Sequence, residues 1–130
     1  MPTVDLAIPP RSAYVGVVRL VVSSLARTAG IEETAVDDLK IAVSEACANA
    51  VLSNEEAGSV APVSIEWHED DEGVEVRVGD RGQVYQGGGP EEPFADRLSM
   101  SVALLGSLVD DFSFEPRPDG GMLTRLIVRL

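Results

Sequence analysis

Glu45 and Asn49 carry the clearest chemical potential in this chain. They lie four residues apart in the run Asp38-Leu-Lys-Ile-Ala-Val-Ser-Glu-Ala-Cys-Ala-Asn-Ala-Val51, so on a helix they share one face, one turn apart. A carboxylate at such a place can take up a proton or hold water, and an amide oxygen can ligate a hard cation. The same spacing is common in solvated helical stripes. Glu45 could instead pair with Lys40 or with an arginine elsewhere, and Asn49 could cap or bridge a loop. The pair alone leaves its role open.

A second polar group, Asp80-Arg-Gly82, directly follows an alternating apolar segment. An Asp-x-Gly at a strand end is first of all a turn signal. The single cysteine, Cys47, lies among small helix residues, and we expect it to be packed rather than reactive. Trp67 and His68 fall in an alternating segment and are interpreted as sheet residues, because one histidine cannot make a metal site.

The elements that must position these groups follow from periodicity and from turn residues. We expect a short edge strand at 4–8, and a helix at 14–29 with Ser12 as its N-cap and Gly30 at its end. A helix at 32–52 that begins near Thr34 carries Glu45 and Asn49. Two strands around 63–67 and 74–78 enclose an acidic turn. A flexible, glycine-bearing loop over 83–93, a helix at 98–109 and two further strands, opened by Phe112 and ended by Leu130, complete the chain.

These elements predict an α+β fold, a two-layer sandwich with two or three helices on one face of a mixed, mostly antiparallel sheet. The 130 residues fit a single domain spanning residues 1–130.

The net charge of −12, from 22 acidic and 10 basic residues, disfavours direct nucleic-acid binding, because such a surface repels phosphates. It suits a basic protein partner instead. The sequence shows neither a signal-peptide pattern nor a long apolar span. We therefore expect no membrane association and a cytoplasmic location.

Taken in order, these motifs resemble the GHKL (Bergerat) ATPase fold, and more closely the anti-sigma-factor serine kinases of the RsbW type. The run from Asp37 to Val51 is similar to the N-box of that family, and Val76-x-Val-x-Asp-x-Gly82 to its adenine-binding strand. The segments 13–20, 108–111 and 121–126 also fit, so the resemblance covers nearly the whole chain.

The resemblance implies ATP and Mg²⁺ as cofactors and a role for each motif residue. Glu45 is implied as the general base that takes the proton of a substrate serine, and Asn49 as the Mg²⁺ ligand. Asp80 is implied to accept the adenine amino group, and Gly82 to let the backbone approach the base. Arg19, on the first helix, is the candidate for partner contact, although an arginine in an apolar helix usually only extends to solvent.

The phosphate-binding lid departs from the family pattern. Ser99-Met-Ser101 replaces the Gly-x-Gly at the helix N-terminus that meets the phosphates, so Ser99 and Ser101 are expected to offer amides and hydroxyls there. Asp96 would repel the triphosphate unless Arg97 offsets it. On the last strand Leu123 stands where the family carries a nucleotide-facing threonine, and Thr124 is expected to point to the opposite face.

The function implied is that of a homodimeric anti-sigma factor in transcription regulation. It sequesters an alternative sigma factor and phosphorylates a serine of a STAS-type anti-anti-sigma partner with Mg-ATP. A binding-only module of the same fold, weakened or inactive in catalysis, is the first alternative. A sensor or structural domain unrelated to sigma factors is the second.

Overall fold

The computed structural model describes residues 3–82, 92–118 and 120–130, and the side chains of all of these except 92–98. Five strands, three α-helices and one 3-10 turn form in this part of the chain. In chain order they are β1 (Thr3–Ile8), η1 (Ser12–Tyr14), α1 (Val15–Thr28), α2 (Glu33–Glu56), β2 (Val63–Glu69), β3 (Gly73–Gly79), α3 (Glu92–Leu108), β4 (Asp111–Pro116) and β5 (Met122–Arg129).

The five strands form one sheet in the order β1-β2-β3-β5-β4, and β1 lies at an edge as expected. All four pairings are antiparallel, so the expectation of a mixed sheet is wrong for the described strands. The reason lies in the connections: β2 and β3 join through a short acidic turn, and β4 and β5 through a second turn, and such turns link antiparallel neighbours.

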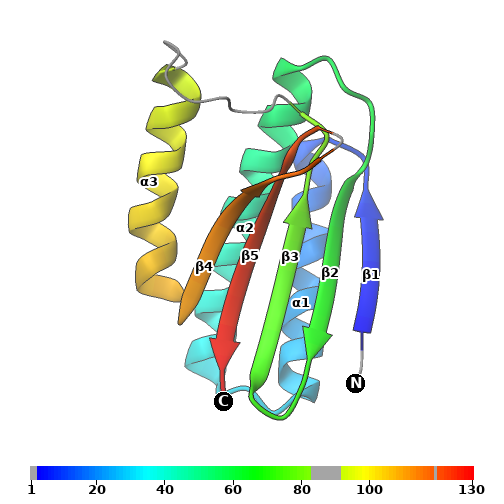
Figure 1. Cartoon of the computed structure of the whole chain (residues 1–130). Helices are drawn as coiled ribbons and strands as arrows, with labels where there is room; N and C mark the ends of the chain where they lie inside the picture. Colours follow the sequence, from blue (N-terminus) through cyan, green and yellow to red (C-terminus); the bar gives the residue numbers. More distant parts are fainter. Residues whose placement is uncertain (1–2, 83–91, 119) are drawn as a thin grey trace.

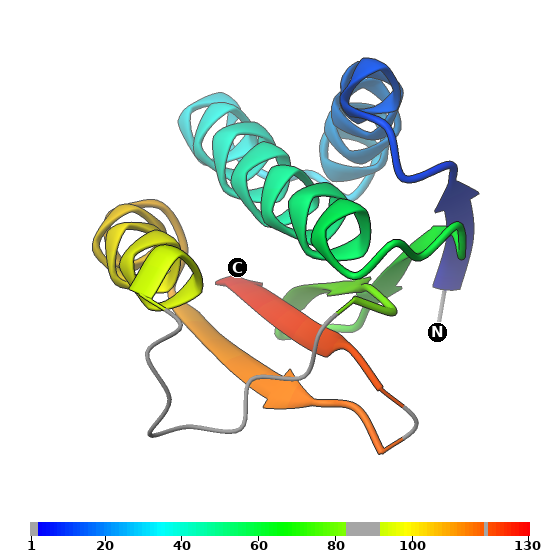
Figure 2. The same ribbon diagram turned by 90° about the horizontal axis from the view of Figure 1, so that it is seen from above.

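All three helices cover the same face of this sheet, with α2 between α1 and α3 (Figures 1 and 2). Alternation along the strands supplies the core. On β5, Met122, Thr124, Leu126 and Val128 are buried while the residues between them are half-buried, because successive side chains point to opposite faces. Trp67 is buried on β2, which confirms its assignment as a sheet residue. The two-layer α+β class is confirmed.

Helix boundaries differ from the sequence expectation at three places. Ser12 is not an N-cap: it lies inside η1, and the residue that precedes α1 is Tyr14, which makes no capping side-chain bond. Helix α2 continues to Glu56, four residues past its predicted end, and α3 begins at Glu92 rather than near 98. Gly30 ends the α1 region with φ of +83°, a conformation that favours glycine.

The predicted flexible loop falls largely on residues 83–91, outside the described part of the chain. None of the described helices is both long and apolar enough to cross a lipid bilayer.

Candidate functional site

Glu45 and Asn49 share one face of helix α2, and the neighbouring faces of this helix pack into the core. Its buried positions repeat at helical spacing and pack against the sheet and α1: Val36, Leu39, Ala42, Val43, Ala46, Cys47, Ala50 and Val51. Glu45 and Asn49 lie half-buried at the margin of this apolar surface. Cys47 is packed as expected, and burial raises the pKa of its thiol to about 12, so it stays protonated.

Ser101 of α3 lies between the two side chains. Its Oγ is 2.6 Å from Glu45 Oε2 and 2.6 Å from Asn49 Nδ2, and it is completely buried. Asn49 Nδ2 is also 3.4 Å from the same Glu45 oxygen. The Glu45 carboxylate is engaged by Ser101 of α3, whereas Lys40 lines a hollow beside Arg19.

The hydrogens available on Ser101, Glu45 and Asn49 determine which group donates each hydrogen bond. An ionised carboxylate only accepts, so the single hydroxyl hydrogen of Ser101 goes to Glu45. The Ser101 oxygen must then accept from the Asn49 amide nitrogen. The amide oxygen of Asn49 is therefore turned away from Ser101, where it is free to serve as a ligand for a hard cation.

Asp80 directly follows β3 and is buried. Its Oδ1 accepts hydrogen bonds from the amides of Gly82 at 2.9 Å and Met122 at 3.2 Å, and from the Ser53 hydroxyl at 3.4 Å. Burial raises the pKa of Asp80, and the amides of Gly82 and Met122, the Ser53 hydroxyl and the Arg117 charge oppose that rise. Asp80 is thus a fixed acceptor at the end of the sheet, bonded to the same helix that carries Glu45.

Gly82 is where the loop after β3 touches α2. A Cβ built on Gly82 would lie 2.5 Å from the carbonyl carbon and from the oxygen of Ser53, closer than any side chain tolerates. The structure therefore gives a packing reason for this glycine. Its predicted role beside the adenine base stays a prediction.

Asn54 is the residue of this region that sequence reasoning missed. It is completely buried, accepts from the Arg81 amide at 2.9 Å and donates to the Ala61 carbonyl at 2.9 Å. It thereby ties the loop after β3 to the end of α2. The sequence predicts a helix that stops at residue 52, so Ser53 and Asn54 fall outside it. A longer helix would have shown Ser53 on the same stripe as Glu45 and Asn49, at four-residue spacing.

The lid serines lie elsewhere than expected. Helix α3 begins at Glu92, so Ser99 and Ser101 lie in the helix interior, where their amides bond within the helix rather than at a free N-terminus. Ser99 is exposed. Ser101 enters the site through its hydroxyl, not through its amide. The side chains of Asp96 and Arg97 lie outside the described part.

The expectation for the last strand is also wrong. Thr124 pairs with Val78 of β3 and is buried on the face that carries the helices, whereas Leu123 lies on the open face. The pairing of β5 with β3 sets this phase, and alternation then places every second residue on the helix side. Thr124, not Leu123, therefore lies on the same face as Val78.

The donor set fits a nucleotide with its magnesium ion in part. Asn49 supplies an oxygen ligand and Glu45 the neighbouring carboxylate, and the described residues hold no cluster of three acidic, histidine or cysteine side chains that would bind a metal unaided. A single amide oxygen is compatible with Mg²⁺, which usually takes one or two protein ligands and completes its shell with phosphates and water. Asp80 offers a buried acceptor. The interior amides of Ser99 and Ser101 do not fit the phosphates.

Arg19 lies apart from this site, on α1. It lines a hollow of about 490 Å³ between α1 and α2 together with Asp37, Lys40, Ile41 and Ser44. Glu45 and Asn49 instead contact α3, and α2 separates α3 from α1 (Figure 2).

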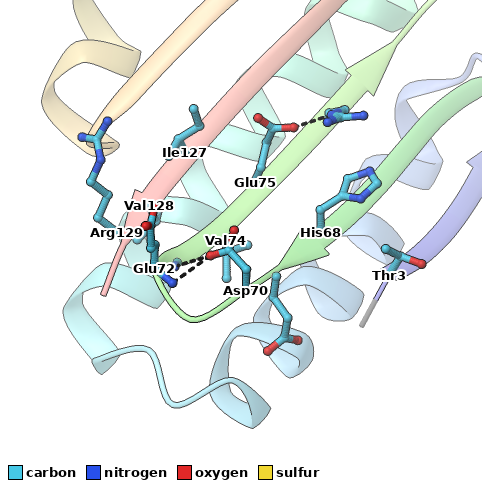
Figure 3. A pocket seen from close by; sticks show the side chains of 12 residues that line it. Thr3, His68, Asp70, Glu72, Val74, Glu75, Ile127, Val128 and Arg129 are labelled. Carbon is cyan, nitrogen blue, oxygen red and sulfur yellow. Dashed lines mark hydrogen bonds and ion pairs between the residues drawn. The ribbon is translucent and has the colours of Figure 1, made fainter. Parts of the chain in front are cut away.

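A second hollow, of about 460 Å³, lies on the open face of the sheet near the β2–β3 turn (Figure 3). His68, Glu75 and Ile127 line it from three different strands. Its charged groups pair locally: Glu75 with Arg77, and His68 with Glu66 at 3.3 Å. The hollow faces away from the helices and is separate from the Glu45 and Asp80 region.

Comparison with known proteins agrees with this geometry. The family model described as the histidine kinase-like ATPase domain matches residues 8–127. The serine-protein kinase RsbW of Bacillus licheniformis is 33% identical over 119 residues, which cover 83% of this chain and 74% of the relative. RsbW of Bacillus subtilis is 34% identical, with the same coverage of both chains.

Two solved structures share the fold. The RsbU and RsbW domains of a Mycobacterium tuberculosis protein superpose with a TM-score of 0.77 at 21% identity, over 100% of this chain and 33% of that chain. The SiaB–SiaC complex of Pseudomonas aeruginosa gives a TM-score of 0.62 at 10% identity, over 98% of this chain and 89% of that chain. With the family match and the identity to the two Bacillus kinases, the chain belongs to the histidine kinase-like ATPase domains and, within them, to the serine-protein kinases of the RsbW type.

Proposed function

We propose that this protein binds Mg-ATP and transfers the γ-phosphoryl group to a serine of a STAS-type anti-anti-sigma partner. The observation that carries the proposal is the common anchoring of three groups on α2. Glu45 and Asn49 lie one turn apart on it, and Ser53, one turn further, bonds Asp80 at 3.4 Å. A base, an oxygen ligand for a cation and a buried acceptor are thus held to one rigid helix.

In this proposal each residue has one task. Glu45 takes the proton of the substrate hydroxyl. Asn49 would hold Mg²⁺ through its amide oxygen, and the ion would neutralise charge on the triphosphate. Asp80 would accept a hydrogen bond from the adenine amino group. Phosphoryl transfer depends mainly on positioning and charge neutralisation, so these few groups suffice.

Regulation follows from charge. Phosphorylation adds about −1.5 to −2 to the partner at pH 7. Since this chain carries a net charge of −12, a phosphorylated partner is repelled more strongly than an unmodified one. The freed protein then binds an alternative sigma factor, through a surface that includes Arg19 beside the hollow between α1 and α2. We propose that the active form is a cytoplasmic homodimer.

The test uses the purified chain and a purified STAS-type protein. Titration calorimetry with Mg-ATP measures nucleotide binding, and mass spectrometry of the partner measures phosphoryl transfer. We expect E45Q to lose about 10²- to 10⁴-fold in transfer, the range of general-base catalysis, while it still binds nucleotide. The matched control is E55Q, because Glu55 is an exposed glutamate of the same helix. Equal transfer by E45Q and E55Q would remove Glu45 as the base.

A binding-only module is the second candidate, and one observation favours it. Ser101 engages both Glu45 and Asn49 in this structure, and the amides of Ser99 and Ser101 are internal to α3. This candidate predicts that the chain binds a sigma factor, that titration with Mg-ATP gives no heat of binding, and that no phosphoryl group is transferred to the partner. R19E, compared with R11E at another exposed arginine, tests the proposed partner surface by co-purification with a sigma factor. Light scattering tests the dimer.

A further inference from the structure

Helix α3 contacts the rest of the molecule through the partly buried Leu108 and through two completely buried side chains among its residues 99–108. These are Ser101 and Leu105, one turn apart and both completely buried. Met100, Val102 and Leu104 are exposed. Leu105 joins the hydrophobic core, whereas Ser101 bonds Glu45 and Asn49. The polar attachment of this described part of α3 to α2 thus runs through the proposed catalytic pair.

The contact of Ser101 with Glu45 has the geometry that catalysis requires of a substrate. A general base must lie about 2.6–3.2 Å from the hydroxyl oxygen whose proton it takes. Ser101 Oγ is 2.6 Å from Glu45 Oε2. The substrate proposed above is also a serine hydroxyl. Ser101 therefore presents to the base the same functional group, at the same distance, as the acceptor would.

Ser101 is nevertheless poorly arranged to be phosphorylated. It is completely buried, so a phosphoryl group on its oxygen would displace α2 or α3. Its oxygen also accepts from Asn49 Nδ2 at 2.6 Å, which occupies one of its two lone pairs and leaves only the other for attack. The resulting dianion would in addition lie beside the Glu45 carboxylate, and like charges repel.

We propose that Ser101 competes with the partner's acceptor serine for the Glu45 carboxylate. In the resting protein Ser101 holds this carboxylate, until the acceptor serine of the partner displaces it. The inference rests on the proposed function, because it needs Glu45 as the base. Transfer then requires Ser101 to give up its hydrogen bond, and α3 to loosen from α2, when the acceptor hydroxyl reaches Glu45. Ser101 is thereby an autoinhibitory contact between α3 and α2.

The S101A variant tests this with two readouts that should move in opposite directions. Without the hydroxyl, the acceptor no longer competes for the carboxylate, so kcat/KM for the STAS-type partner at saturating Mg-ATP should rise roughly 10- to 100-fold, the range of a hydrogen bond to a charged group. The melting temperature should fall, because a buried hydrogen-bonded group is lost. A serine with only a structural role would lower both.

S107A is the matched control, because Ser107 lies on the same helix, is exposed and bonds only the Leu104 carbonyl of its own helix at 2.8 Å. It should change neither readout. In the wild-type chain, addition of the partner should speed amide hydrogen exchange in α3, and this measurement remains decisive if S101A does not fold. Unchanged exchange would overturn the inference.

The remaining outcomes separate the inference from the function on which it rests. If the wild type transfers phosphoryl groups and folded S101A is no faster, the competitor role is wrong and Glu45 keeps its own. If neither protein transfers although both bind Mg-ATP, the kinase proposal fails, and the inference fails with it. Phosphate found on Ser101 by mass spectrometry would make it a substrate rather than a competitor.

Discussion

Substitution of Gly82 by alanine is the sharpest test of how the loop after β3 is held against α2. The added Cβ would lie 2.5 Å from the carbonyl carbon and oxygen of Ser53, and ordinary contact begins at 3.4 Å. Loop and helix must therefore separate by about 0.9 Å, the difference of these two values. The Ser53 hydroxyl oxygen lies nearer still and can rotate away, but the carbonyl carbon and oxygen are backbone atoms, so no side-chain rotation relieves their overlap.

The energetic cost follows from this displacement. Forcing a methyl group into a packed site costs about 1–3 kcal/mol. The hydrogen bond from the Arg81 amide to Asn54 Oδ1, now 2.9 Å, would lengthen beyond hydrogen-bonding range, and its loss adds about 0.5–1.5 kcal/mol. We expect G82A to reduce the free energy of unfolding by about 2–4 kcal/mol, which corresponds to a fall in Tm of roughly 8–16 °C for a domain of this size.

Urea unfolding and thermal melting of the purified variant measure this cost. The control is G106A: a Cβ on Gly106 of α3 comes no closer than 3.7 Å to Phe112, and alanine in a helix interior is favoured over glycine by about 0.5–1 kcal/mol. The same substitution should thus destabilise at Gly82 and stabilise at Gly106. A G82A protein with the wild-type Tm and urea midpoint would refute the close approach of the loop to Ser53.

Three further predictions concern neighbouring groups. N54A leaves the Arg81 amide and the Ala61 carbonyl without their partner, so we expect a loss of about 2–5 kcal/mol in urea unfolding; a loss below about 1 kcal/mol would contradict the buried bridge. L105A removes a completely buried anchor of α3 and should cost about 2–5 kcal/mol, with faster hydrogen exchange in α3 than in α1; equal exchange in the two helices would argue against a local anchor. For Asp80, burial raises the pKa in the native state above the ordinary 3.8. The native state therefore binds more protons than the unfolded state. The contribution of Asp80 to stability falls as pH rises from about 3.8 through the raised native pKa. D80N lacks that dependence. In urea titrations from about pH 4 to about pH 7, the free energy of unfolding of D80N should therefore increase relative to that of the wild type as pH rises. If the two plots of unfolding free energy against pH run parallel, Asp80 does not cause the pH dependence.

The predictions from sequence succeeded where a local pattern has one solution. Period-two alternation at Val74, Val76 and Val78 fixed a half-buried strand, and the structure has all three buried on β3. The four-residue spacing of Glu45 and Asn49 fixed their common face, because helix geometry leaves no choice. Their 3.4 Å contact confirms it.

Predictions failed where the outcome depends on a partner distant in sequence. Ser101 lies 56 residues from Glu45, and no local rule links them. The start of α3 had no strong N-cap signal, so its extension to Glu92 and the interior position of the lid serines went unrecognised. Thr124 was assigned to the wrong face because its phase is set by pairing with Val78 rather than by its own neighbours.

By itself the sequence determined the fold class, the helix that carries Glu45 and Asn49, the strand that Asp80 follows, and the family. These features depend on periodicity and on short motifs, which are local and can therefore be recognised in a single sequence. Tertiary structure alone decided what those groups touch: Ser101 between Glu45 and Asn49, Ser53 on Asp80, and Asn54 beneath the loop. Such contacts arise only when separate elements pack, because each buried polar group must then find a partner among whatever side chains the packing brings within reach.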